Sequence, residues 1–222
     1  MAVAAALLMI SPAAAAPQKK MTDWTRTVVA TPEGGFRMGN PKARVKLVEY
    51  GSLTCPHCRH FAQTGMGPLK AYVKGGKVSY EYRNYILNGV DIAATLVARC
   101  GGAQRFFPIA DKLYATQADW VGKVVNLASA EKQKLNDLDD GARMVRLAQL
   151  SGITSLAASQ GLPAAQANKC LADAGAMNRL EQMVEMGRGF GVEGTPTFFV
   201  NDSMVSAADW PSLEPFLKKA GG

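Results

Sequence analysis

The stretch that decides the fold is residues 45–58, which read VKLVEYGSLTCPHC. Its first half mixes valine, leucine and tyrosine, which are residues that suit a pleated strand. In such a strand Val45, Leu47 and Glu49 share one face, because successive side chains alternate between the two faces. A Cys-x-x-Cys pair follows within a few residues. The stretch therefore predicts a strand that leads directly into two closely spaced cysteines.

A helix is predicted over residues 56–73. Proline is favoured in the first turn of a helix, and Gly75 and Gly76 are typical of a helix end. Residues 78–82 then alternate valine and tyrosine with polar residues, which indicates a second strand. An order of strand, helix and strand needs a crossover connection, so at least part of the sheet is predicted to be parallel.

The second half of the chain carries a different pattern. Over residues 91–189 apolar side chains recur at helical spacing, and we interpret this block as five helices. Strand-like sequence returns at residues 196–200, and Asn201-Asp202 is predicted to be the turn of a hairpin. A closing helix is predicted over residues 210–217.

Together these elements predict an α/β fold in two parts. Residues 17–90 and 190–222 form the sheet domain, because their strands belong to one sheet. The intervening residues 91–189 form a large all-helical insertion domain, which leaves the sheet and returns to it.

The N-terminus has the features of a signal peptide at residues 1–16. An apolar run is followed by Ala14 and Ala16, which fit the small-x-small rule for cleavage after Ala16, although no Lys or Arg precedes the run. The segment is shorter than the roughly 20 residues that a membrane-spanning helix needs. We therefore expect an exported, soluble protein.

Charge and cysteine content narrow the class of function. The formal net charge of +7 is spread along the 222 residues, which favours solubility and weak attraction to anionic membranes rather than nucleic-acid binding. Four cysteines are too few for a disulfide scaffold of this length. In an oxidising compartment they permit two bridges, and Cys55 and Cys58 are predicted to pair with each other.

Thiol–disulfide exchange is the chemistry that Cys55-Pro56-His57-Cys58 predicts. The reaction needs an accessible thiolate, and a helix N-terminus favours the anion through its unpaired N–H groups and its dipole. His57 adds a positive or hydrogen-bond-donating group close to both sulfurs. Cys55 is therefore predicted to be the attacking sulfur, and Cys58, one turn into the helix, the resolving one.

A structural zinc site is the alternative for these residues. The available ligands are the two cysteines, His57 and His60, all within six residues of one helix. Zinc needs four ligands in a tetrahedron, which such a segment does not provide. We therefore expect no metal.

The second cysteine pair, Cys100 and Cys170, falls in the helical block. A structural disulfide is the favoured interpretation in an oxidising compartment, and two buried free cysteines are the alternative. Three methionines, Met177, Met183 and Met186, either line an adaptable surface for client proteins or belong to the core.

Glu49, the Cys-Pro-His-Cys motif and Thr195-Pro196 resemble the DsbA family of periplasmic thiol:disulfide oxidoreductases. The resemblance covers nearly the whole chain after residue 16 and implies a thioredoxin-like fold with a helical insertion. It implies that Pro196 is a cis-proline beside the reactive disulfide and that Thr195 offers its backbone to an extended substrate. Glu49 matches the family's buried acid, which exchanges protons with the resolving cysteine.

The resemblance implies a periplasmic disulfide oxidase that needs no cofactor. It would donate the Cys55–Cys58 disulfide to unfolded secreted proteins, act as a monomer, and be reoxidised by a membrane-bound, DsbB-like partner. Thr195 departs from the best-known oxidases, which carry valine there, and threonine also occurs in the isomerase relatives. Alternatives are therefore an isomerase or reductase of the same fold, or a chaperone or binding module with a structural disulfide.

Overall fold

The computed structural model describes residues 22–222, so the predicted signal peptide at residues 1–16 lies outside the described residues. A mixed sheet has the strand order β1-β2-β4-β3-β5-β6. Its strands are β1 (Val28–Ala30), β2 (Phe36–Gly39), β3 (Val45–Gly51), β4 (Val78–Asn84), β5 (Thr197–Val200) and β6 (Ser203–Val205).

The strands β3 and β4 are parallel, as the order of strand, helix and strand predicts. Val45 lies opposite Val78 and Gly51 lies opposite Asn84. On its other side β3 pairs antiparallel with β5, which comes from the far end of the chain. β3 is therefore an interior strand, and the loop that leaves it starts in the middle of the sheet.

The segment after Cys55 forms two helices, α1 (Pro56–Thr64) and α2 (Met66–Lys74), where the sequence predicts one. The break falls at Gly65. Pro68 explains it, because proline has no N–H to donate to the carbonyl of Thr64 and its ring clashes with the residue four positions earlier. The prediction of one continuous helix is wrong at this point.

Alternate side chains of β3 enter two separate cores. Val45 and Leu47 belong to the main core, whereas Tyr50 packs with Phe199 in a smaller core on the other face of the sheet. Glu49 shares the face of Val45 and Leu47 and keeps only 2% of its surface exposed. The alternation predicted from the sequence therefore carries a carboxyl group into the main core.

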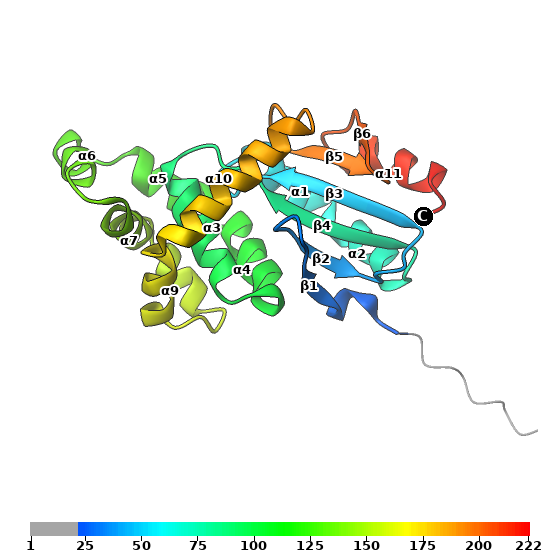
Figure 1. Cartoon of the computed structure of the whole chain (residues 1–222), viewed down its shortest axis with the longest axis horizontal. Coiled ribbons are helices and arrows are strands. Elements are labelled where there is room, and N and C mark those ends of the chain that lie inside the picture. The colour runs from blue at the N-terminus through cyan, green and yellow to red at the C-terminus, as the bar shows by residue number, and fades with distance from the viewer. Residues whose placement is uncertain (1–21) are drawn as a thin grey trace, which may run out of the picture.

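Helices fill the chain between β4 and β5, and Figure 1 shows them gathered to one side of the sheet, with α10 running back towards it. They are α3 (Gly89–Cys100), α4 (Ala103–Ala115), α5 (Gln117–Val125), α6 (Ser129–Asn136), α7 (Asp140–Ser151), α8 (Ile153–Ala158), α9 (Ala164–Leu171) and α10 (Ala174–Gly189), and α11 (Trp210–Lys219) closes the chain. Within residues 22–222 no helix has the length and apolar character needed to span a bilayer.

The five helices predicted for this block are eight in the structure. The sequence pattern missed α5, α6 and α8. α6 is mostly polar and buries only Leu135, and α8 has six residues, so neither carries an apolar stripe long enough to detect.

A disulfide ties this block together. Cys100, the last residue of α3, is bonded to Cys170 in α9, with an S–S distance of 2.04 Å and a Cα–Cα distance of 5.8 Å. The two cysteines are 70 positions apart in sequence. The bond therefore closes a loop that contains most of the helical block.

The strands β5 and β6 form the hairpin that the sequence predicts. Asn201 and Asp202 make its turn with φ values of 48° and 65°, which are typical of a two-residue hairpin turn. The Asn201 side chain also accepts a hydrogen bond of 2.8 Å from the backbone N–H of Lys46, which ties the hairpin to β3.

Candidate active site

Cys55 is the N-cap residue of α1, in the loop that leaves β3. The backbone N–H of Cys58 donates to the Cys55 sulfur over 3.4 Å, and Pro56 occupies the first turn of the helix. The preceding turn is closed by the Cys55 N–H, which donates to the carbonyl oxygen of Ser52 over 3.2 Å. We call residues 52–55 the cysteine loop. It places the Cys55 sulfur where backbone N–H groups and the helix dipole favour an anion.

These contacts lower the pKa of the Cys55 thiol from its ordinary value of 9.0 to about 5. The largest cause is a hydrogen bond from the Cys58 side chain. The Thr195 side chain and the backbone N–H groups of Cys58 and His57 add to it, whereas burial acts in the opposite direction. Cys55 is therefore a thiolate at neutral pH, which is the nucleophilic form.

Cys58 has the opposite environment. Its side chain is fully buried, whereas Cys55 keeps 4% of its surface exposed. Burial, the hydrogen bond to Cys55 and the nearby Glu49 carboxyl raise the pKa of Cys58 well above its ordinary value. Both cysteines are reduced in this structure. One sulfur of the pair is therefore ionised and near the surface, and the other is a buried thiol.

Glu49 lies in the main core beneath this pair. The hydroxyl of Tyr80, on the neighbouring strand β4, donates to its carboxyl oxygen over 2.6 Å. Burial raises the pKa of Glu49 from 4.5 to about 8, although the Tyr80 hydrogen bond acts to lower it. At neutral pH this carboxyl group is mostly protonated and can release its proton within the physiological range.

The Thr195–Pro196 peptide bond is cis and lies directly against Cys55. When protonated, the Cys55 sulfur donates to the carbonyl oxygen of Thr195 over 3.2 Å. The Thr195 hydroxyl is buried and has no hydrogen-bond partner among the described residues, and the Thr195 side chain lowers the Cys55 pKa. It is therefore a hydrogen-bond donor that acts on the thiolate.

His57 affects Cys55 through its backbone. The imidazole of His57 is exposed, and the backbone N–H of His57 is the group that lowers the Cys55 pKa.

Asp91, which the sequence analysis did not single out, organises one side of the cysteine loop. This buried residue in the first turn of α3 accepts hydrogen bonds from the Ser52 hydroxyl at 2.6 Å and the Leu53 N–H at 3.1 Å. It also accepts one from the Leu87 N–H at 3.0 Å, in the loop between β4 and α3. Burial raises the Asp91 pKa from 3.8 to about 6. One carboxyl group thus joins the cysteine loop to the helical block.

Two further residues of the helical block hold the other side. The Gln117 side chain at the start of α5 donates to the carbonyl oxygens of Leu53, at 2.8 Å, and Cys55, at 2.9 Å. The Tyr114 hydroxyl at the end of α4 donates to the carbonyl oxygen of Ser52 at 3.0 Å. The conformation of the cysteine loop therefore depends on helices that lie outside the sheet.

A sequence signal for these residues exists in retrospect. Asp91 and Gln117 are polar residues in the first turns of two helices, and both are buried, with 0% and 3% of their surfaces exposed. Buried polar side chains are expected to have specific partners. Residues 22–222 contain no cluster of three or more His, Cys, Asp or Glu side chains suited to an ion.

Comparison with known proteins identifies the family. A family model described as Thioredoxin matches residues 31–219. The chain belongs to the thioredoxin family. Its mixed sheet, its Cys-x-x-Cys helix and the block of helices between β4 and β5 confirm the predicted fold class, which is α/β and thioredoxin-like with a helical insertion.

Among solved structures, this thioredoxin-family chain is similar to a protein-disulfide isomerase from Novosphingobium aromaticivorans. The TM-score is 0.79 and the sequence identity is 29%, over 85% of this chain and 98% of that one. The chain also has the fold of alpha-DsbA1 from Wolbachia pipientis, with a TM-score of 0.62 and 21% identity over 86% of this chain and 92% of that one. The predicted resemblance to DsbA proteins is therefore confirmed at the level of the fold.

Proteins named protein-disulfide oxidoreductases from Rickettsia bellii and Rickettsia typhi are 26% and 28% identical to this thioredoxin-family chain. The matches cover 85% and 83% of this chain. They cover 65% and 61% of the two Rickettsia proteins, so the chain spans less than two thirds of the length of these relatives.

Proposed function

We propose that the chain is a protein disulfide oxidase that donates a Cys55–Cys58 disulfide to cysteines of exported proteins. The proposal rests on the opposite shifts of the pKa values of the two cysteines. The Cys55 pKa is lowered to about 5, and the pKa of buried Cys58 is raised well above its ordinary value. Names of similar proteins support the same class of reaction.

The direction of the reaction follows from the thiolate. The contacts that stabilise ionised Cys55 act on the reduced state, because neither sulfur carries a charge in the disulfide. They therefore make the disulfide easier to reduce and the chain a stronger oxidant. A low thiol pKa also makes Cys55 a good leaving group in the last step of exchange.

The proposed exchange has two steps. A client thiolate attacks the Cys55 sulfur, the Cys55–Cys58 bond breaks, and Cys58 leaves as a thiolate that must be protonated. A second client thiolate then attacks the client sulfur of the mixed disulfide, and Cys55 leaves as a stable thiolate. The client loses two electrons and gains a disulfide, and the chain becomes the dithiol.

Glu49 is the proposed source of the Cys58 proton. Its pKa of about 8 keeps it mostly protonated at neutral pH, and its ionised form raises the pKa of Cys58. Thr195 and Pro196 would bind the extended client segment, since their loop lies against Cys55. The Cys100–Cys170 disulfide has a structural role in this proposal.

The setting of the reaction is also a proposal. The predicted signal peptide supports export to the periplasm, where disulfides persist. We propose a soluble monomer without a cofactor, which a DsbB-like membrane partner reoxidises. N-terminal sequencing of the mature protein, recovered from a periplasmic fraction, tests export. Pro17 as the first residue supports it, and an intact Met1 contradicts it.

Disulfide isomerisation is the second candidate function. The Novosphingobium protein is named a protein-disulfide isomerase, and the hydroxyl of Thr195 faces the reactive sulfur. The two candidates use different redox forms of the chain. An oxidase in its disulfide form introduces bonds into a reduced client, whereas an isomerase in its dithiol form rearranges a scrambled client.

The deciding experiment is the reduction potential of Cys55–Cys58 against glutathione, with the Cys55 titration followed by ultraviolet absorbance. An oxidase is expected to lie well above the roughly −270 mV of thioredoxin. A potential at or below that value, with an ordinary thiol pKa, would exclude the oxidase and leave a reductase or a binding module. Cys58→Ser, incubated with a reactive client, is expected to accumulate a mixed disulfide that Cys55→Ser does not form.

A further inference from the structure

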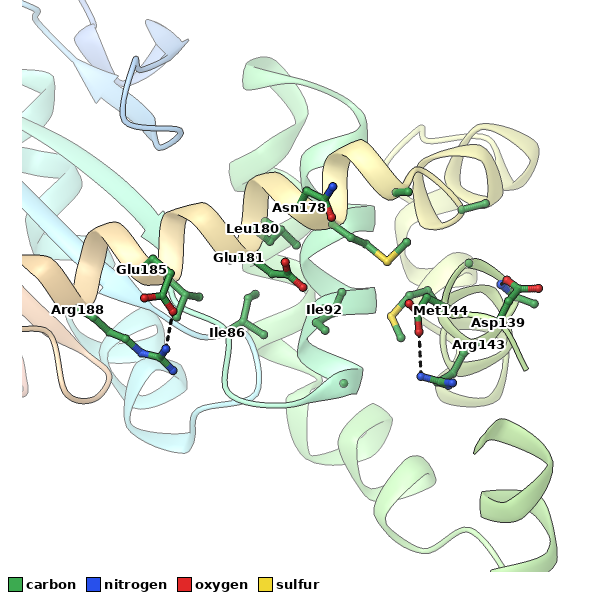
Figure 2. Close-up of a pocket in the computed structure, with 18 residues that line it drawn as sticks. Ile86, Ile92, Asp139, Arg143, Met144, Asn178, Leu180, Glu181, Glu185 and Arg188 are labelled. Atoms are coloured by element: carbon green, nitrogen blue, oxygen red, sulfur yellow. Dashed lines mark hydrogen bonds and ion pairs between the residues drawn. The ribbon is translucent and has the colours of Figure 1, made fainter. Parts of the chain in front are cut away.

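A hollow of about 920 Å³ lies along α10, where this helix passes α3 and the start of α7. Figure 2 shows its lining, in which side chains from α10 face those from α3 and α7 across an open space. We call it the α10 groove. It contains none of the cysteines and none of the residues assigned above to disulfide exchange.

Apolar side chains line much of the α10 groove. Ile86 and Ile92 come from the β4–α3 loop and α3, and Leu180 and Val184 come from α10. Methionine contributes as well, because Met177 lines the groove from α10. Apolar groups of this kind, with a flexible thioether among them, suit segments of varied sequence.

Of the three methionines that the sequence analysis grouped together, Met177 lines the groove. Met183 belongs to the core and is 6% exposed, whereas Met186 is 39% exposed. The sequence left open whether the three methionines lie at the surface or in the core, and the structure places them in different environments.

Charged residues surround the apolar lining, and within residues 22–222 two of its carboxylates, Asp139 and Glu181, have no ion pair. Arg143 is paired with Asp140 at 3.0 Å, and Arg188 is paired with Glu185 at 2.5 Å. Glu181 has no ion pair with any cation of residues 22–222, and Figure 2 shows its carboxylate pointing into the space between α10 and α3. The groove is therefore locally acidic on a chain whose formal net charge is +7.

The α10 groove begins close to the proposed active site. Gly89, which lines the groove, follows Asn88, whose side chain donates to the Thr54 hydroxyl over 3.0 Å. Thr54 directly precedes Cys55. At the same end α10 leads into the loop that carries Thr195. A polypeptide with a cysteine at Cys55 is therefore within reach of the groove.

We propose that the α10 groove is a docking site for an unfolded client segment that combines apolar residues with a lysine or arginine. The apolar side chains enter the hollow, and the cation of the client pairs with Glu181. The inference rests on the proposed function, because it specifies which clients that function favours. The charge complementarity at Glu181 selects cationic over anionic segments.

Binding of two short, cysteine-free fluorescent peptides tests the proposal by fluorescence anisotropy. One peptide alternates leucine with lysine, and the other alternates leucine with glutamate. Wild type is expected to bind the cationic peptide more tightly, and Glu181→Lys to bind it about tenfold more weakly. Glu181→Gln is expected to lie between them. Asp119→Lys, an equal charge change at an exposed site of α5 outside the groove, is expected to match wild type.

Equal binding by wild type and Glu181→Lys would overturn the proposal, as would equal affinity for the two peptides. Sedimentation that shows a dimer disrupted by Glu181→Lys would assign the groove to a second copy of the chain instead. Thiol exchange with glutathione, measured on the same samples, separates this test from the proposed function. Glu181→Lys is expected to exchange at the wild-type rate, and a wild type that does not exchange would refute the function while the binding result stands.

Discussion

The sulfur of Cys55 lies 3.2 Å from the carbonyl oxygen of Thr195, a residue 140 positions further along the chain. The contact joins the parts of the chain that precede and follow the helical block. It also brings the Thr195 hydroxyl to the sulfur whose ionisation we propose as the driving feature of the reaction. The redox chemistry of Cys55 is therefore expected to respond to changes at Thr195.

Replacing the hydroxyl of Thr195 tests this response. We expect Thr195→Val to raise the Cys55 pKa above about 5, by about one unit, the effect of one hydrogen bond to a charged group. The reduction potential is expected to fall, since the thiolate is less stable. Ultraviolet titration and equilibration with glutathione measure both. Thr197→Val removes a hydrogen bond to Gly194 in the same loop and serves as the control; an equal effect in both variants would contradict a direct role of the Thr195 hydroxyl.

The buried acid predicts a pH dependence of stability. Burial raises the Glu49 pKa from 4.5 to about 8, so the folded chain retains a proton that the unfolded chain releases above pH 4.5. The stability linked to this group is fully present below pH 4.5 and is lost as the pH rises towards about 8. In the oxidised form, which has no cysteine thiol at this site, we expect Glu49→Gln to lack this loss.

At pH 7 the oxidised Glu49→Gln variant is therefore expected to be more stable than wild type, by about 1 kcal/mol or more. Denaturant unfolding at several pH values between 4 and 9 measures the difference. Parallel profiles for the two proteins would show that Glu49 is not protonated in the folded state. The same variant is expected to slow formation of the mixed disulfide between Cys55 and a client, because Cys58 then leaves the Cys55–Cys58 bond with no carboxyl proton available to it.

The contact between Gln117 and the cysteine loop predicts a cost in stability. Gln117→Ala leaves the carbonyl oxygens of Leu53 and Cys55 without this donor in a buried site, so we expect a loss of about 1–3 kcal/mol. Gln63→Ala, on the exposed side of α1, is the matched control and is expected to change little. Equal midpoints of denaturation for the two variants would argue against the contact.

Loss of the Cys100–Cys170 bond is expected to lower stability without changing the Cys55 pKa. Closing a loop of 70 residues restricts the unfolded chain, which corresponds to a stabilisation of about 4 kcal/mol. The double substitution of both cysteines by serine is therefore expected to lower the free energy of unfolding while the Cys55 pKa stays near 5. Wild-type stability of the variant would show that the disulfide does not stabilise the fold. A shifted Cys55 pKa would show that the disulfide influences the active site.

Local pattern was enough to predict the central strands and the helix that begins at the Cys-x-x-Cys motif. β3, the helix start at Cys55, β4 and the hairpin turn at Asn201 lie where the sequence places them, because each depends on side chains within a few residues. Burial of Glu49 was predictable for the same reason, since alternation along one strand decides its face. The sequence by itself therefore determined the fold class and the position of the reactive sulfur at a helix start.

Only the tertiary structure decided what surrounds that sulfur. Asp91 and Gln117 form hydrogen bonds with the cysteine loop from helices that are 36 or more positions away. Tyr80 donates to Glu49 from the adjacent strand. The carbonyl oxygen of Thr195 contacts Cys55 although the whole helical block separates the two residues in the sequence. No local pattern specifies such contacts, because they depend on how distant elements pack. The pKa values of Cys55 and Glu49 depend on these contacts and on burial, and so the strength of the proposed oxidant is a property of the folded chain.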